Sequence, residues 1–399
     1  MRRLDPFVVL QVARFSSVLG IQMVSVAVGW EVYARTGRPL DLGLVGLVQF
    51  IPALLLFPVT GLVADRVERT GVLRTCAAAQ MLAAATLAAL ATLGAPLWAV
   101  YLTLVLLASA RAFAAPASSA ILPALVGPER FPRAVALASS IMQVATIAGP
   151  ALGGAVYALS GRASVVYGIA AGLIALAVVC LSLLPPVVPE GRGASRSWDD
   201  VFAGLRFLRG NAVLFSAVML DLFAVLLGGA VALLPAVASD VLGAGPEALG
   251  VLRGAPAVGA AAMALWMSRN PPRRHAGRVM LGAVALFGLA TIAFGLSKYF
   301  LLSVAMLVLL GAADEVSVVI RQTLLQVGTP DHMRGRVSAV NMLFVGISNE
   351  IGELESGLVA AVIGVVPAIV AGGVGTLAVV VCFVTLAPAL RDAHLGPKA

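Results

Sequence analysis

The sequence predicts an all-α integral membrane protein with twelve transmembrane helices. Only 12% of its 399 residues are charged, 60% are hydrophobic, and the mean hydropathy is +1.02. Apolar runs of membrane-spanning length recur along the whole chain, and in lipid each run must satisfy its own backbone as a helix. The first run follows Arg2 and Arg3 without a small-residue cleavage site, so we expect a first transmembrane helix and no removable signal peptide.

Each apolar run marks one expected span. In the first half the spans are expected at 7–33, 42–64, 72–93, 97–121, 134–159 and 164–185. In the second half they are expected at 213–238, 248–267, 279–296, 300–326, 337–363 and 365–387. An even number of spans places both termini on the same side of the membrane.

The basic residues predict which side that is. With a cytoplasmic N-terminus, nineteen of the 27 Lys and Arg residues fall in cytoplasmic segments and four in outer loops. The remaining four, Arg14, Arg111, Arg253 and Arg321, lie within spans. This is a strong positive-inside bias, so we expect a multi-pass membrane protein with both termini in the cytoplasm.

The longest polar connection divides six spans from six. The predicted domains are therefore an N-terminal bundle (1–185), a cytoplasmic linker (186–211) and a C-terminal bundle (212–399). Within the linker, 198–208 has amphipathic spacing and is expected to lie along the inner membrane surface. A plain tether is an equally good interpretation of this segment.

The two halves also resemble each other at an offset of about 203 residues. Arg133–Leu137 parallels Arg336–Val340, and glycines recur at matching places in the helices that follow. Repeated halves with a site at their interface are a recurring transporter plan. The repeat predicts two six-helix bundles related by pseudo-two-fold symmetry.

Ionisable residues inside spans are candidate functional residues by default. A proton-coupling group must be a carboxylate whose protonation changes with its surroundings, and a nearby arginine affects that equilibrium. The coupling candidates are Asp314, which lies two turns before Arg321 on nearly the same helix face, and then Asp221, Glu315 and Glu350. For each acid, a structural ion pair that holds one conformation is the alternative.

Other polar residues in the spans are candidates for the substrate cavity. These are Arg14, Gln22, Glu31, Arg111, Gln143, Arg321 and Asn341. For Gln and Asn, hydrogen bonds between helices are the commoner role. The repeat places Arg111 and Asp314 at equivalent positions, which predicts a charge pair between the halves. The roles of Glu350, Glu353 and Glu355 are left open between proton entry, cation attraction, pairing with Arg253 and capping of the outer vestibule.

The segment Gly61–Arg69 (GLVADRVER) closes the second span and resembles the loop motif of the major facilitator superfamily, G-x-x-x-D-R-x-G-R-R/K. Glu68 and Thr70 depart from that motif. The resemblance implies the major facilitator fold and a conformational-gating role for the loop residues and their counterparts. The gating candidates are Gly61, Asp65, Arg66, Arg69, Arg133 and Arg336.

A second motif lies in the fifth span. Gly149, Pro150, Gly153 and Gly154 resemble the antiporter motif G-x-x-x-G-P-x-x-G-G, with Ala145 in place of its first glycine. The residues also suit close helix packing and a bend whatever the direction of transport. Segments 29–33, 42–50, 329–341 and 349–357 are similar to the enterobactin-exporter-like branch of drug and siderophore antiporters. That resemblance implies proton-driven efflux across a bacterial cytoplasmic (inner) membrane.

These observations predict a secondary transporter that exports a small amphiphilic molecule, such as a siderophore, a macrolide or a drug-like compound, by alternating access. Proton-coupled uptake and lipid or lysolipid transport are the alternatives, and a non-transporting receptor fits poorly with acids inside spans. No nucleophile–base pair, metal cluster or phosphate-binding loop stands out, so we expect no enzyme and no metal. The expected partners are substrate, protons and the bilayer, with no nucleic acid and no cofactor beyond the proton gradient, in a monomer.

Overall fold

The computed structural model describes residues 5–126, 130–188, 198–270 and 275–394, and every regular element in those ranges is helical. The first half holds α1 (Pro6–Thr36), α2 (Pro39–Arg66), α3 (Arg69–Leu93), α4 (Leu97–Leu125), α5 (Phe131–Ser160) and α6 (Ala163–Ser182). Each begins and ends within a few residues of an expected span. α3 and α5 end at glycines with left-handed backbone, Gly94 at φ 63° and Gly161 at φ 67°, a common way to end a helix.

The second half begins with the amphipathic segment of the linker, which forms α7 (Trp198–Arg209). The long helices that follow are α8 (Ala212–Leu227), α10 (Pro246–Arg269), α11 (Ala276–Leu296), α12 (Phe300–Gly328), α13 (Asp331–Ile363) and α14 (Val365–Leu386). Short elements are η1 (Ala230–Leu233), α9 (Leu234–Ala236), the π-helical η2 (Val237–Val241) and α15 (Pro388–Arg391). The expected span 213–238 is therefore a broken helix, which the apolar pattern did not predict.

Eleven helical segments in the described part of the chain are long and apolar enough to cross a membrane. The twelfth expected span, 337–363, corresponds to α13, a continuous helix of 33 residues. Its charged residues, among them Glu350, Glu353 and Glu355, lower its hydropathy. The all-helical membrane fold is thus confirmed. Among the long helices in the described ranges, α13 is the one that is more polar than a typical membrane span.

Internal contacts divide the chain into two compact units. Unit 1 consists of Met1–Arg35, Val48–Ser195 and Ala244–Gly254, and unit 2 of Thr36–Leu47, Arg196–Gly243 and Ala255–Ala399. α2 and α10 each contribute to both units. The predicted division at the linker 186–211 stays a prediction.

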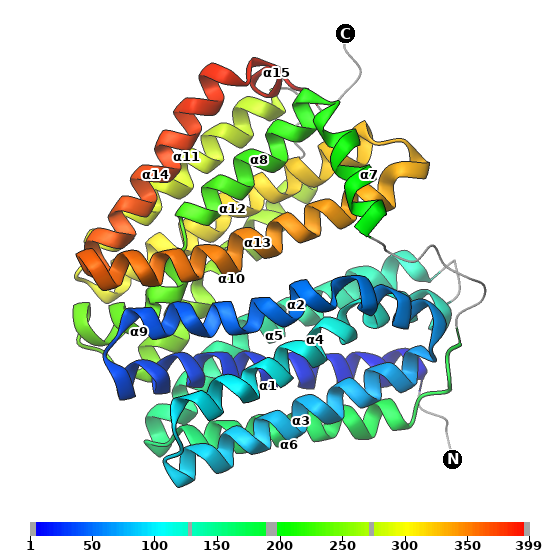
Figure 1. Cartoon of the computed structure of the whole chain (residues 1–399), viewed down its shortest axis with the longest axis vertical. Coiled ribbons are helices and arrows are strands. Elements are labelled where there is room, and N and C mark those ends of the chain that lie inside the picture. The colour runs from blue at the N-terminus through cyan, green and yellow to red at the C-terminus, as the bar shows by residue number, and fades with distance from the viewer. Residues whose placement is uncertain (1–4, 127–129, 189–197, 271–274, 395–399) are drawn as a thin grey trace. The chain divides into compact units, whose positions relative to one another are not determined.

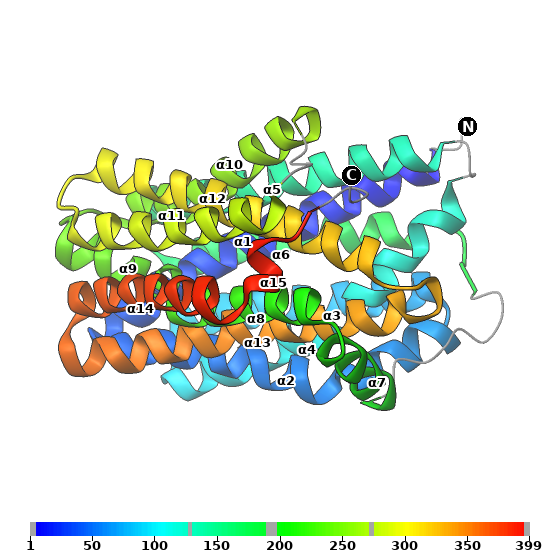
Figure 2. The same cartoon turned by 90° about the horizontal axis from the view of Figure 1, so that it is seen from above.

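The same packing pattern occurs in each unit. In unit 1, α3 packs against both α4 and α6, and in unit 2, α11 packs against both α12 and α14 (Figure 1). The predicted repeat relates α3 to α11, α4 to α12 and α6 to α14, so the two patterns correspond. α13 packs against α8 and, near its first turns, against α7 (Figure 2).

Close approach of α10 and α12 depends on glycine. A Cβ atom added to the buried Gly311 would collide with the carbonyl oxygen of Pro256, whereas one added to the exposed Gly282 on α11 would meet nothing within 4 Å. We expect Gly311→Ala to lower the stability of the purified protein by about 1–3 kcal/mol, the usual cost of overpacking.

Gly282→Ala is the matched control, and we expect it to be neutral or stabilising by up to about 1 kcal/mol because alanine favours a helix interior over glycine. Thermal unfolding of both variants in one detergent measures the difference. Equal unfolding temperatures would show that α10 and α12 are not packed as closely as described.

Candidate functional site

A cluster of buried polar side chains lies inside unit 2, where α8, α12 and α13 meet. α8 contributes Asp221, α12 contributes Asp314 and Arg321, and α13 contributes Asn341. Asp221, Arg321 and Asn341 are 4%, 3% and 3% exposed. Charged groups are almost never buried to this extent unless they are paired, so the cluster requires a charge-balancing arrangement.

An ion pair between two helices provides part of that balance. Nη1 of Arg321 lies 2.7 Å from Oδ2 of Asp221 and donates a hydrogen bond of 3.2 Å to Oδ1 of Asn341. Nε of Arg321 has no hydrogen-bond partner among the described residues. The sequence placed Asp314 near Arg321 on the same helix, whereas the ion pair of Arg321 is made with Asp221 on α8.

Asp314 lies beside this pair and faces two cavities. The larger has a volume of about 350 Å³ and the smaller about 10 Å³. Asp314, Val225 and Phe287 line both, and the smaller cavity is also lined by Asp221 and Ser317. Asp221 and Arg321 both act electrostatically on Asp314. The carboxyl group therefore has open space on one side and the ion pair on the other.

The larger cavity is mostly apolar and carries three polar side chains. Asp314, Asn349 and Glu353 line it together with parts of α8, α10, α11 and α12. A Cβ atom on Gly46 of α2 would lie against the side chain of Glu353, so this glycine leaves room for the carboxylate. A concave apolar space with a few polar groups is the usual form of a small-molecule site.

The break after α8 shapes this cavity. Gly228 and Gly229 separate α8 from η1 and line the cavity. A Cβ on Gly228 would collide with Phe287, and one on Gly229 with the carbonyl oxygen of Gly352. Broken helices in transporters place backbone groups next to a binding site. The adjacent glycines were the sequence signal for this feature, which our sequence reasoning missed.

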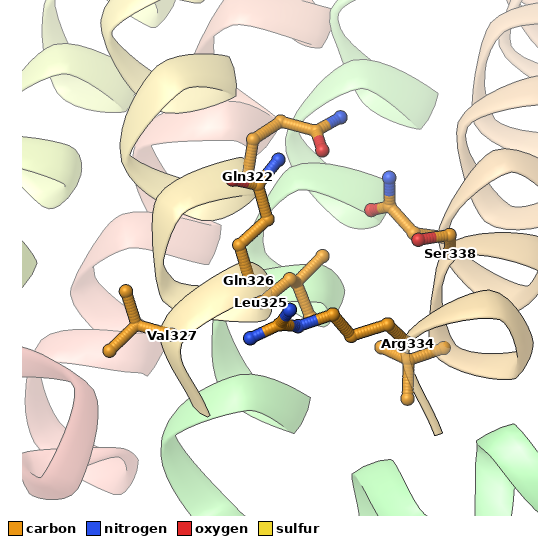
Figure 3. Close-up of a pocket in the computed structure, with 8 residues that line it drawn as sticks. Gln322, Leu325, Gln326, Val327, Arg334 and Ser338 are labelled. Atoms are coloured by element: carbon orange, nitrogen blue, oxygen red, sulfur yellow. The ribbon is translucent and has the colours of Figure 1, made fainter. Parts of the chain in front are cut away.

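A third cavity, of about 650 Å³, lies between α12 and α13 near the loop that joins them. Figure 3 shows Gln322, Gln326, Arg334 and Ser338 around it. Asn341, which accepts from Arg321, also lines this cavity. Polar groups thus connect the three cavities through Asp314, the Asp221–Arg321 pair and Asn341, all within unit 2.

The remaining coupling candidates lie on the same helices. Glu315 follows Asp314 on α12 and is half-buried, and Glu350 lies on α13, also half-buried. The predicted pairing of Glu353 or Glu355 with Arg253 stays a prediction, as does the charge pair between Arg111 in unit 1 and Asp314 in unit 2.

Several cavity candidates of unit 1 take part in helix packing. Glu31 on α1 is 6% exposed, accepts a hydrogen bond of 2.7 Å from the hydroxyl of Tyr167, and forms an ion pair with Arg35. The side chain of Gln22 lies so close to Gly149 that a Cβ atom added to this glycine would collide with it. Gln143 is half-buried on α5. Glu31 therefore connects α1 to α6 through its hydrogen bond with Tyr167, and its predicted place in the substrate cavity stays a prediction. Arg14 and Arg111 line a separate cavity of unit 1.

The residues of the loop motif lie at helix ends. Arg69 donates from Nη1 to the carbonyl oxygen of Ala120 at 3.1 Å, which ties α3 to α4. Gly61 is buried on α2, whereas Arg66, Arg133 and Arg336 are exposed. The side chain of Asp65 lies outside the described residues. Their predicted gating role stays a prediction.

The motif of the fifth span forms a packing surface. Cβ atoms on Gly149 and Gly153 would meet Gln22 and Met23 of α1, and one on Gly154 would meet the carbonyl oxygen of Pro246 on α10. The carbonyl oxygen of Pro150 lies against Gly250 of α10 in the same way. Small residues therefore allow α5 to approach two helices within unit 1.

Comparisons with known proteins agree with this fold. The family model of the Major Facilitator Superfamily matches residues 10–353. Among curated relatives, the enterobactin exporter EntS of Shigella boydii serotype 18 (strain CDC 3083-94 / BS512) is 28% identical over 390 residues, covering 96% of this chain and 92% of the relative. The protein of the same name from Escherichia coli (strain K12) is 27% identical with the same coverage.

Solved structures show the same fold at low sequence identity. A bacterial homolog of the human lysosomal transporter Spinster, in an inward-facing and occupied conformation, has a TM-score of 0.78 at 16% identity and covers 98% of each chain. A bacterial homologue of the iron transporter ferroportin, in an inward-facing state, has a TM-score of 0.71 at 17% identity and covers 98% of this chain and all of that one. With the spans and the family match, this shows that the chain belongs to the Major Facilitator Superfamily of membrane transporters and resembles its enterobactin-exporter branch.

Proposed function

We propose that this protein is a proton-coupled exporter that moves a small amphiphilic molecule out of the cytoplasm by alternating access. The observation that carries the proposal is Asp314, an acid between two cavities and beside a buried ion pair. Acids in such surroundings mark ion or proton pathways in membrane proteins.

Charge balance in the cluster supports a proton as the coupling ion. Asp221 and Asp314 together with Arg321 carry a formal charge of −1 when all three are ionised. One proton neutralises the cluster, and the ion pair then retains one carboxylate for the guanidinium. A group that binds one proton while buried and releases it when water enters is what coupled transport requires.

The three cavities suggest a route for that proton. Glu353 and Asp314 line the first cavity, Asp314 and Asp221 the second, and Asn341 the third. With the orientation predicted from the basic residues, α13 runs from the cytoplasm outward. The route then leads inward from Glu353, through Asp314 and the ion pair, to the space around Arg334.

The direction of transport follows the relatives, which are named exporters. The fifth-span motif and the positive-inside bias support efflux across a bacterial inner membrane with both termini in the cytoplasm. In this mechanism the proton gradient supplies the energy without a bound cofactor, and one chain is sufficient for transport.

Transport by purified protein in liposomes tests the proposal. A panel of siderophores, macrolides and other amphiphiles is presented under an imposed proton gradient, and substrate and proton movements are recorded together. We expect at least one compound to move against the proton flow. Substrate movement in the same direction as protons would contradict export, and movement independent of the gradient would contradict proton coupling.

A further inference from the structure

Unit 1 contains a cavity of about 310 Å³ that the coupling mechanism does not use. Residues of α1, α3, α4, α5 and α6 line it. The polar lining consists of Arg14, Ser17, Gln80, Arg111 and Ser118. The rest is apolar, and the lining includes no carboxylate. The cavity therefore combines two positive charges with an apolar surface.

Arg14 is held in position by one neighbouring residue. Its Nε and Nη2 donate to the hydroxyl oxygen of Ser118 at 2.9 and 2.7 Å, and Nη2 also donates to the carbonyl oxygen of Ser118 at 2.9 Å. These contacts involve one edge of the guanidinium on α1 and fix it to α4. Among the described residues Nη1 of Arg14 has no such hydrogen bond, so it keeps its donors for a ligand.

Arg111 is less constrained. Its Nη1 lies 3.5 Å from Oε1 of Gln49, and its side chain is exposed in the cavity wall. In the described part of the chain, neither Arg14 nor Arg111 forms an ion pair, in contrast to Arg321 of unit 2 with Asp221. Among the described residues, Arg321 is thus paired with a carboxylate and the two arginines of this cavity are not.

Two guanidinium groups inside spans without a carboxylate are an expensive arrangement in a bilayer. A structural role would be better met by a neutral side chain, because Ser118 is satisfied by any hydrogen-bond donor. A planar guanidinium is the group that recognises carboxylate or phosphate oxygens with paired hydrogen bonds. An anion in this cavity would balance the charge that the chain leaves unbalanced.

The apolar walls restrict what else the ligand contains. Leu10, Val18, Ile21, Leu73 and Met142 surround the arginines. The volume is at the lower end of the range for small-molecule sites, about 300–1,000 Å³. It suits the anionic end of an amphiphile with a short apolar portion rather than the whole of a large molecule.

We propose that the cavity between Arg14 and Arg111 is a recognition subsite for the carboxylate or phosphate end of an amphiphilic substrate. That the ligand bound here is the transported substrate rests on the proposed transport function. The binding itself depends only on unit 1 and on no proton movement.

Equilibrium binding to the purified full chain in nanodiscs of zwitterionic lipid tests the subsite. Octanoate and octyl phosphate are compared with octanol and octylammonium, which have the same apolar chain, by their effect on the unfolding temperature. We expect the two anions to bind at least tenfold more tightly than octanol and octylammonium not to bind. Equal affinity for octanoate and octanol would overturn the proposal.

Variants locate the site. We expect Arg14→Gln and Arg111→Gln each to lower octanoate affinity at least tenfold while leaving octanol unchanged. Arg74→Gln, an exposed arginine of α3, is the matched control and keeps wild-type affinity. Arg14→Lys keeps the positive charge at this position. Its unfolding temperature without ligand, compared with that of the wild type, shows whether a substitution here misfolds the protein rather than removing the binding site. Full octanoate affinity in both glutamine variants would overturn the proposal.

A last experiment distinguishes a soluble anionic substrate from an anionic lipid as the ligand of this cavity. Addition of phosphatidylglycerol to the nanodiscs should leave octanoate binding unchanged. Displacement of octanoate, together with loss of copurified anionic lipid from the arginine variants, would overturn the substrate role. Asp314→Asn should bind octanoate normally, so failure of proton coupling and failure of this subsite give different results.

Discussion

Asp314→Asn is expected to abolish proton movement coupled to substrate while preserving substrate exchange. Asparagine has the size of the protonated aspartate but cannot release a proton, so the variant stays in the neutral form. Losing a positioned proton-transfer group costs about 100-fold or more in rate, and we expect at least that loss of gradient-driven transport. Exchange of labelled for unlabelled substrate without a gradient needs no proton release and should continue.

Liposomes with wild type and variant side by side provide the measurement. Asp331→Asn is the matched control, because that carboxylate is 88% exposed and pairs with Arg334 in the first turn of α13. The control should transport as wild type does. Unchanged proton flux in Asp314→Asn would leave this acid with a structural role and would shift attention to Asp221 and Glu353.

Arg321→Met is expected to destabilise the protein by about 3–5 kcal/mol, the cost of leaving a buried charge without its partner. The ion pair of Arg321 with Asp221 has side chains only 3% and 6% exposed. Without the guanidinium, the buried Asp221 would lie beside the half-buried Asp314 with no cation between them. Asp221→Leu should be destabilising for the converse reason.

The double variant Asp221→Leu/Arg321→Met tests whether pairing is the cause. We expect it to recover most of the lost stability, because replacing a whole buried pair by apolar groups is often neutral. The exposed pair of Arg334 with Asp331, at 2.8 Å, is the control, and its removal should change stability by at most about 1 kcal/mol. A double variant as unstable as Arg321→Met, measured by thermal unfolding, would contradict the buried pair.

The sequence by itself determined most of the long helices and, to within a few residues, their ends, with the break after α8 as the exception. A helix in lipid satisfies its own backbone, so the length and composition of each apolar run are enough to predict it. This is why α12 and α14 fall within a few residues of the expected spans. The local repeat of the helix also placed Asp314 and Arg321 on nearly the same face of α12, and the unusual charges marked both as candidates.

Only the tertiary structure decided which groups meet. The partner of Arg321 is Asp221, about a hundred residues away in sequence, because α8 packs against α12. Helical periodicity describes positions on one helix and says nothing of which neighbour faces it. For the same reason the sequence did not reveal that Glu31 accepts a hydrogen bond from Tyr167 of α6. The adjacent glycines at 228 and 229 signal a break in the sequence, but only the packing shows that Gly228 lies against Phe287.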